Sequence, residues 1–139
     1  MPSVFSRIIA GEVPARMVWT DERCVAFLDA HPLRPGHTLL VPRSEVDHWI
    51  DLDADLLAHL TGVAHTLGRA LQHGFHPLKV GMLLAGLEVP HVHIHLVPIR
   101  TLAHLDLAHR EWDPAPEMLD AAAETIRASL RELGAPPRV

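Results

Sequence analysis

The sequence has little cysteine and no long apolar run. Cys24 is the one cysteine among 139 residues, so no disulfide framework can form within the chain. No apolar stretch approaches the roughly 18 residues of a membrane-spanning helix, and residues 1–7 lack the apolar core of a signal peptide. We therefore expect a cytoplasmic protein that has no membrane partner.

Basic patches and glycine-rich loops are also missing. The formal net charge is −5, which argues against duplex nucleic acid as a partner. The sequence contains no glycine-rich phosphate loop and no pattern of a parallel strand–helix–strand fold. A small nucleotide is still an acceptable ligand, because a few local groups decide its binding. The hydrophobic content of 48% predicts one folded domain over residues 1–139.

Three histidines, His91, His93 and His95, alternate with aliphatic residues. Successive side chains of a β-strand point to opposite faces, so the histidines would share one face and the aliphatic residues the other. Pro90 and Pro98 bracket the run, as expected at the ends of a strand. The pattern predicts a strand with its aliphatic face on a core.

The histidine face admits three interpretations. One is a polar outer face, although histidine is not enriched there as threonine, lysine and glutamate are. Another is a metal site, because alternate strand positions can converge on one ion. The third is a catalytic site, with one imidazole as nucleophile and the others as orienting groups and proton donors.

The rest of the chain predicts an antiparallel α+β domain, because short strands joined by turns are interspersed with helices. Residues 101–112 are predicted to be irregular. The predicted helices span residues 4–10, 51–73 and 116–133, the last ended by residues 134–137, and the predicted strands span residues 17–20, 24–29, 37–42, 78–84 and 89–98.

The helix predicted over residues 51–73 is the longest. Asp51 or Asp53 can cap its start, and Gly74 is predicted to end it. Beyond its main apolar stripe it carries further apolar residues, and we expect these to face a partner subunit. They are Leu57, Ala64 and Ala70.

Residues 91–97, read as His-Val-His-Ile-His-Leu-Val, match in full a signature in which histidines alternate with apolar residues. Residues 4–15, 24–29 and 35–42 supply further matches in the right order. The chain is therefore identified as a member of the histidine triad family. The resemblance covers a core of about residues 4–98, with an extension that carries a helix over residues 99–139.

The resemblance implies an α+β fold with a five-stranded antiparallel sheet, a short N-terminal helix, a long central helix and a C-terminal helix. It also implies a homodimer in which the two sheets join. Members are nucleotide hydrolases and transferases, so the expected substrate is a purine nucleoside phosphoramidate or phosphoanhydride attacked at its α-phosphate. No cofactor is expected.

Residue roles follow from the same resemblance. His93 would be the nucleophile that forms a nucleotidyl-histidine, and His95 would contact the phosphate or leaving group. His91 and His37 would orient His93, and Asp29 would bind the ribose hydroxyls. The remaining residues expected to bind the nucleotide are Phe5, Ile8, Phe27, Leu28, Gly86 and Glu88.

Several positions depart from the family pattern. Val80 stands where many members have a polar amide, Leu87 replaces a polar residue, and Glu88 replaces a phosphate-binding hydroxyl. Glu88 would repel a phosphate if it faces the site, hold a histidine cationic if it faces one, or matter little if it faces solvent. Ser6 replaces a cysteine of the structural zinc site of some members, so no zinc is expected.

These departures leave two other functions open. One is a nucleotide-binding module with little turnover. The other is a metal-binding protein that uses the three histidines of the triad together with Glu88.

Overall fold

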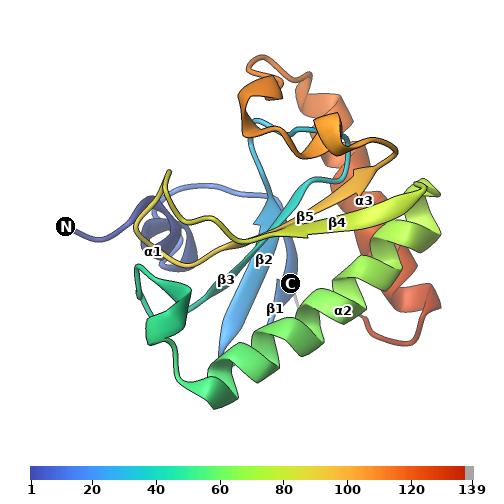
Figure 1. The fold of residues 1–139 in the computed structure, drawn as a ribbon. Helices are drawn as coiled ribbons and strands as arrows, with labels where there is room; N and C mark the ends of the chain where they lie inside the picture. Colours follow the sequence, from blue (N-terminus) through green and yellow to red (C-terminus); the bar gives the residue numbers. More distant parts are fainter. Residues whose placement is uncertain (137–139) are drawn as a thin grey trace.

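The computed structural model describes residues 1–136, which form a five-stranded antiparallel sheet with three α-helices (Figure 1). The elements are α1 (Val4–Ile9), β1 (Met17–Thr20), β2 (Cys24–Leu28), β3 (Thr38–Pro42), η1 (Trp49–Asp51), α2 (Ala54–Phe75), β4 (Lys79–Leu83), β5 (Ile94–Ile99), η2 (Leu102–Leu105), η3 (Leu107–His109) and α3 (Pro116–Glu132). The strand order is β1-β2-β3-β5-β4, which confirms the predicted α+β fold. Residues 137–139, including Pro137 of the predicted helix end, lie outside the described residues.

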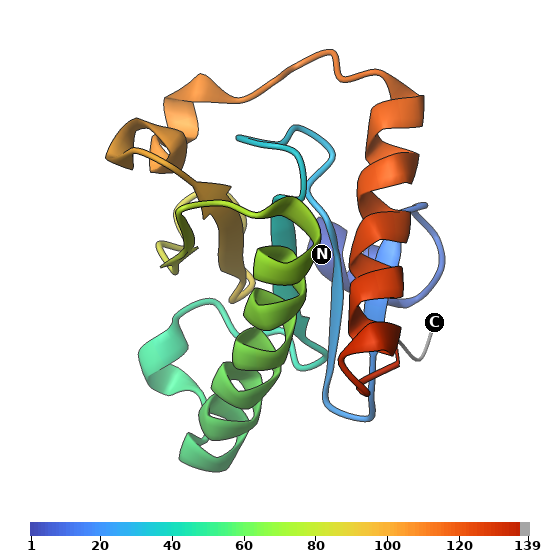
Figure 2. The same ribbon diagram turned by 90° about the vertical axis from the view of Figure 1, so that its right-hand side faces the viewer.

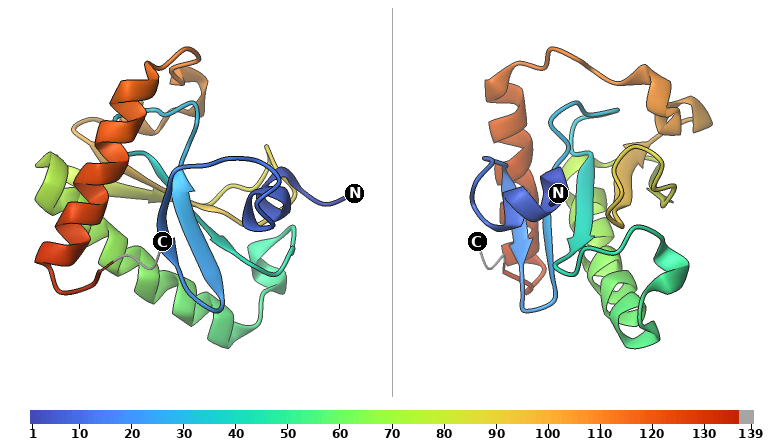
Figure 3. Two further views of the ribbon diagram at one scale, coloured as in Figure 1. Left: turned by 180° about the vertical axis from the view of Figure 1, so that it is seen from behind. Right: turned by 90° about the vertical axis from the view of Figure 1, so that its left-hand side faces the viewer.

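The sheet separates two apolar clusters. The helices α2 and α3 cover one face, and the short α1 lies against the other (Figure 2; Figure 3). Leu40 and Leu96 belong to the main core beneath α2 and α3, whereas Phe5, Phe27 and Leu39 form the cluster on the α1 side. Because side chains alternate along a strand, residues next to Leu96 face α1. The fold therefore places the histidine face of β5 on the α1 side.

The helix α2 ends later than predicted. Asp53 caps its start as predicted. Gly74 does not end the helix, because the helix continues to Phe75 and ends at His76, which has a left-handed backbone with φ of 51°. Gly74 instead lies against α3, where an added Cβ atom would come within 2.7 Å of Thr125 Cγ2. The missing side chain allows the close approach of the two helices.

The apolar residues of α2 outside its main stripe pack largely within the chain. Ala70 is fully buried in the main core, so the prediction that it faces a partner subunit is wrong. Ala64 also packs in this core, and in addition it lines a groove between α2 and β4. Leu57 is half-buried. Within the described residues, no helix combines the length and the apolar character that crossing a membrane requires.

The histidine strand is shorter than predicted. It begins at Ile94, so the first two histidines of the triad precede the strand, and the amide of Val92 donates to the Val46 carbonyl instead (2.8 Å). Pro98 lies inside β5, not at its end. This position tolerates proline because β5 pairs with β3 only as far as Leu96, so that β4 alone flanks Pro98.

Residues 101–112 contain the two short 3-10 turns η2 and η3 where the sequence predicted irregular structure. The segment crosses from β5 to α3 over the loop that joins β2 and β3 (Figure 2). The amide of Glu111 donates to the Pro32 carbonyl of that loop (2.9 Å). The C-terminal extension is thereby placed beside the ends of the central strands.

Candidate active site

Two adjoining cavities lie on the α1 side of the sheet. The larger, of about 310 Å³, lies between α1, the end of β2 and α3, and its lining is mainly apolar. The smaller, of about 190 Å³, lies against His93 and His95. The two cavities share Phe5, Asp29, His31 and Leu39 as lining residues, so they form one continuous surface.

The larger cavity brings together the four apolar side chains that the sequence analysis expected to bind the nucleotide. These residues are Phe5, Ile8, Phe27 and Leu28. Such a cavity suits a flat, weakly polar ring, because ligand pockets are mainly apolar with a few fixed polar groups. Gly86, which the sequence also proposed, lines neither cavity.

The side chain of His91 supports α1 and does not orient the ring of His93. Its Nε2–H donates to the carbonyl of Pro42 (2.8 Å), because a carbonyl can only accept. Its Nδ1 therefore accepts from the hydroxyl of Ser3 (2.6 Å), the residue that caps α1. Burial lowers the pKa of His91, which keeps it neutral in this role. The His91 side chain is thus bound to Ser3 and Pro42, so a contact with His93 that orients it has to come from the His91 backbone.

The backbone of His91 is the part of this residue that contacts His93. His93 Nδ1–H donates to the His91 carbonyl (2.7 Å), so the neutral ring has its lone pair on Nε2. The edge of the ring packs against Phe5, with the ring centroids 4.9 Å apart. His93 is thus held in one orientation and one tautomer at the wall of the smaller cavity.

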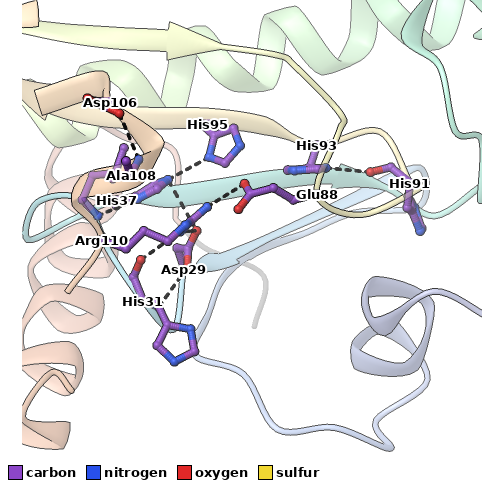
Figure 4. A network of polar contacts seen from close by, with 11 residues as sticks. Asp29, His31, His37, Glu88, His91, His93, His95, Asp106, Ala108 and Arg110 are labelled. Atoms are coloured by element: carbon purple, nitrogen blue, oxygen red, sulfur yellow. Dashed lines mark hydrogen bonds and ion pairs between the residues drawn. The ribbon is translucent and has the colours of Figure 1, made fainter. Parts of the chain in front are cut away.

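His37 positions His95 and not His93. The amide of Leu33 donates to His37 Nδ1 (3.0 Å), so the proton of the neutral ring lies on Nε2. That Nε2–H donates to His95 Nδ1 (2.9 Å), which leaves the proton of His95 on its Nε2. Figure 4 shows this pair beside His93. The prediction that His37 orients His93 is therefore wrong.

Both members of this pair are neutral. Burial lowers the pKa of His37 to about 3, although the Asp29 carboxylate opposes the shift. Burial and the neighbouring His93 lower the pKa of His95 to about 4. Among the described residues, no group accepts a hydrogen bond from His95 Nε2. A buried donor without a partner costs free energy, which suggests that a ligand oxygen or nitrogen accepts this proton.

A three-residue ionic cluster forms the opposite wall of the smaller cavity. Arg110 donates through Nη1 to Asp29 Oδ2 (2.7 Å) and through Nη2 to Glu88 Oε1 (2.8 Å) (Figure 4). Asp29 also accepts from the amide of His31 (2.9 Å). Burial alone would lower the pKa of Arg110, but the hydrogen bonds to the two carboxylates outweigh burial and raise it. Asp29, expected to bind ribose, is thus already bound by a cation.

Sequence reasoning missed Arg110 and Trp112. Arg110 was missed because it follows β5 by several residues in a segment without hydrophobic periodicity. Trp112 packs on His31 at the mouth of the smaller cavity, with ring centroids 4.9 Å apart. The sequence feature that could have pointed to these two residues is an arginine close to a tryptophan in a segment predicted to be irregular.

Metal-ligand atoms come together at three places within the described residues. Two of these groups lie in the site and consist of Asp29, His37 and His95, and of Glu88, His93 and His95. The third consists of Asp21, Cys24 and His59 beside the β1–β2 turn, and in each group the potential ligand atoms lie within 4.8 Å of one another. Burial raises the pKa of Cys24 to about 12, so this thiol is protonated.

Comparison with known proteins identifies the family to which the chain belongs. The family model described as the HIT domain matches residues 10–102, which include His37 and the complete triad. The chain belongs to this family. A HIT-like protein of Methanocaldococcus jannaschii is 37% identical over 68% of this chain and 77% of its own length.

Solved HIT structures share the fold. A zinc-bound histidine triad family protein from Mycobacterium smegmatis superimposes with a TM-score of 0.79 at 25% identity, covering 95% of each chain. A HIT family hydrolase from Legionella pneumophila superimposes with a TM-score of 0.62 at 27% identity, covering 72% of this chain and 95% of its own. These similarities confirm the family proposed from the sequence.

The HIT match also divides the site into two parts. The histidines, Asp29 and Glu88 lie inside the matched residues 10–102. Arg110 and Trp112 lie beyond them, although both line the smaller cavity. The extension therefore adds residues to the HIT site and is not merely a structural appendage.

Proposed function

We propose that this HIT protein is a nucleotide-binding hydrolase or transferase that cleaves a purine nucleoside phosphoramidate or phosphoanhydride at its α-phosphate. The observation that carries the proposal is the fixed pair of tautomers at the smaller cavity. His93 has its lone pair on Nε2, and His95 carries an unpartnered proton on its Nε2. A nucleophile and a hydrogen-bond donor thus lie side by side, with ring centroids 5.0 Å apart.

The chemistry divides into two displacements. With the base in the larger cavity and the α-phosphate in the smaller one, His93 Nε2 forms a bond to phosphorus. The bond from phosphorus to the leaving nitrogen or oxygen breaks, and the leaving group takes a proton from water, while His95 Nε2–H donates a hydrogen bond to the oxygen on which charge develops. Water then attacks phosphorus, releases its proton to the solvent, and frees His93 and the nucleoside monophosphate.

The test is direct detection of the covalent intermediate. Purified protein is mixed with an adenosine phosphoramidate, quenched in the first turnover and digested, and the peptide that contains His93 is examined by mass spectrometry. We expect a labile adenylyl group on this peptide. Turnover without an adduct on any histidine would contradict the mechanism, and a wild-type protein that binds nucleotides without turnover would favour the binding module.

The metal alternative rests on the close approach of Glu88, His93 and His95. We propose that catalysis uses these groups without a divalent ion, because the tautomers already provide nucleophile and donor. Activity on a phosphoramidate should persist in chelator. Stoichiometric zinc in protein prepared without a histidine tag, with activity lost on its removal, would establish the metal alternative instead.

A further inference from the structure

Arg110 is the feature of the site that the proposed chemistry leaves unused. Its side chain is 7% exposed and lines the cavity of His93 and His95. It comes from the segment after η3, outside the residues that the HIT domain matches. Arginine presents a planar fork of donors that fits the oxygens of phosphate.

The two carboxylates that bind Arg110 are not equivalent. The Asp29 side chain is 10% exposed and is also held by the amide of His31. The Glu88 side chain is 45% exposed, and Arg110 is the partner that holds it among the described residues. A half-exposed ion pair contributes little free energy, because water and salt screen it. Glu88 is therefore the partner that leaves Arg110 most easily.

Glu88 also occupies the position of an anion. One of its carboxylate oxygens lies within 4.8 Å of ring nitrogens of both His93 and His95. In Figure 4 its side chain extends along the cavity from the His93 side toward Arg110. An oxygen of a bound phosphate would have the same neighbours, namely Arg110 and the proton on His95 Nε2.

We propose that Arg110 is a phosphate-binding residue of this site and that Glu88 is its displaceable counter-ion. This inference rests on the proposed nucleotide function. In the free protein, Glu88 neutralises Arg110. When a nucleotide phosphate enters, it takes over the Nη2 donor, Glu88 turns toward solvent, and Asp29 keeps Nη1 in place. In this chain Glu88 stands where the family pattern has a phosphate-binding hydroxyl. Arg110, from the C-terminal extension, thereby supplies a phosphate-binding group in place of that hydroxyl.

The test compares binding of AMP and adenosine to the full chain by calorimetry. The variants are Arg110→Gln and Glu88→Gln, with Arg100→Gln and Glu111→Gln as controls that remove the same charges from exposed positions outside the two cavities. Arg110→Gln should weaken AMP about tenfold or more and leave adenosine unchanged. Glu88→Gln should tighten AMP about fivefold, with the gain shrinking as salt rises. The controls should match wild type.

Two results would overturn the proposal. One is AMP affinity in Arg110→Gln equal to wild type. The other is AMP affinity that falls in Glu88→Gln, which would mean that the carboxylate assists binding. Arg110→Lys guards against a disordered site, because it keeps the charge opposite Asp29. It should retain adenosine binding and recover part of the AMP affinity.

Inorganic pyrophosphate separates this proposal from the proposed function. Its stabilisation of the protein against heat should disappear in Arg110→Gln and increase in Glu88→Gln, whether or not any nucleoside binds. If pyrophosphate behaves so and neither AMP nor adenosine binds, the anion site stands and the nucleotide function fails. If AMP binds wild type and Arg110→Gln equally well, the nucleotide function stands and the role of Arg110 fails.

Discussion

The tautomers of His93 and His95, the two histidines that line the smaller cavity, are each fixed by one hydrogen-bond partner. A backbone carbonyl fixes His93, and a backbone amide, acting through His37, fixes His95. Backbone groups cannot exchange donor and acceptor character, so a backbone group sets the tautomer of His93 directly and that of His95 through His37. The reacting nitrogens are therefore prepared before a substrate enters, which reduces the reorganisation required during reaction.

The nucleophile is the first of these assignments to test. His93→Ala should lower turnover of an adenosine phosphoramidate by several orders of magnitude, because the covalent route is lost. AMP should still bind, because both cavities and Arg110 remain. His91→Ala is the contrasting variant, and we expect it to lower the free energy of unfolding, because its partners Ser3 and Pro42 lose their hydrogen bonds. Near-normal turnover by His93→Ala would exclude it as the nucleophile.

The buried histidines also predict a pH dependence of stability. The pKa is about 3 for His37 and about 4 for His95, below the value of 6.5 expected in the unfolded chain. As the pH falls below about 6.5, the unfolded state takes up protons that the folded state refuses. Their stabilisation is thus complete above that pH and is lost as the pH falls toward the folded values. The slope is at most about 1.4 kcal/mol per pH unit for each histidine.

Urea unfolding near pH 7 and near pH 5 measures this slope. In His37→Gln the free energy of unfolding should fall less steeply between these pH values, because the unfolded variant has one fewer histidine that takes up a proton. The ring proton signals of His37 and His95 in NMR spectra should not titrate between these pH values. Signals that titrate with midpoints near 6.5 would contradict the burial argument.

The elements show where sequence reasoning succeeds and where it fails. Short apolar runs between turn residues located the five strands, of which β2 and β3 are buried at every position. Helical periodicity located the three α-helices, because each long helix buries one face. Sequence reasoning wrongly placed Gly74 at a helix end. A glycine in a helical segment either ends the helix or allows another element to approach closely, and only the position of Thr125 on α3 shows that Gly74 does the second. Likewise, the sequence cannot tell whether Ala64 and Ala70 face the core or an interface, because an apolar side chain suits both.

The site was predictable only in part for a similar reason. The triad follows from the signature and His37 from the family resemblance of residues 35–42, but neither indicates the hydrogen-bond partners of these histidines. Two of those partners are backbone groups, the carbonyl of His91 and the amide of Leu33, and every residue has such groups or a near equivalent. Arg110 lies 81 residues from Asp29 in the chain. A contact over such a distance has no local signal.

The packing of α2 on α3 can be tested at two glycines of the same helix. At Gly74, an added Cβ would lie 2.7 Å from Thr125 Cγ2 and 2.8 Å from Ser129 Oγ. At Gly62, it would meet nothing within 4 Å. Gly74→Ala should therefore lower the free energy of unfolding by about 1–3 kcal/mol, as overpacking does. Gly62→Ala should raise it by about 0.5–1 kcal/mol through helix propensity.

Urea or thermal unfolding of both variants gives the two values. If Gly74→Ala and Gly62→Ala raise the free energy of unfolding by similar amounts, α3 moves away from position 74 without a loss of stability. In that case the contact between the two helices would not require glycine at position 74.

At the scale of the whole molecule, the open edge of the sheet is the feature that requires an explanation. Strand β4 is an edge strand, and Met82 on it is 60% exposed. Beside it, a groove of about 450 Å³ runs between α2 and β4, lined by Gly68 and Val80 among others. An exposed edge with apolar side chains invites pairing with another strand. We propose that a second copy of the chain covers it and that the two sheets join at β4.

Two single substitutions test this homodimer. Met82→Lys places a charge on the edge, and Ile50→Lys places the same charge on η1, away from β4, at a residue that is 62% exposed. Light scattering at micromolar concentration should give a dimer for wild type and Ile50→Lys and a monomer for Met82→Lys, because a lysine there must be desolvated on pairing. A monomeric wild type would refute the dimer. A Met82→Lys variant that remains dimeric would place the interface elsewhere, because an interface centred on β4 cannot bury that charge without a partner.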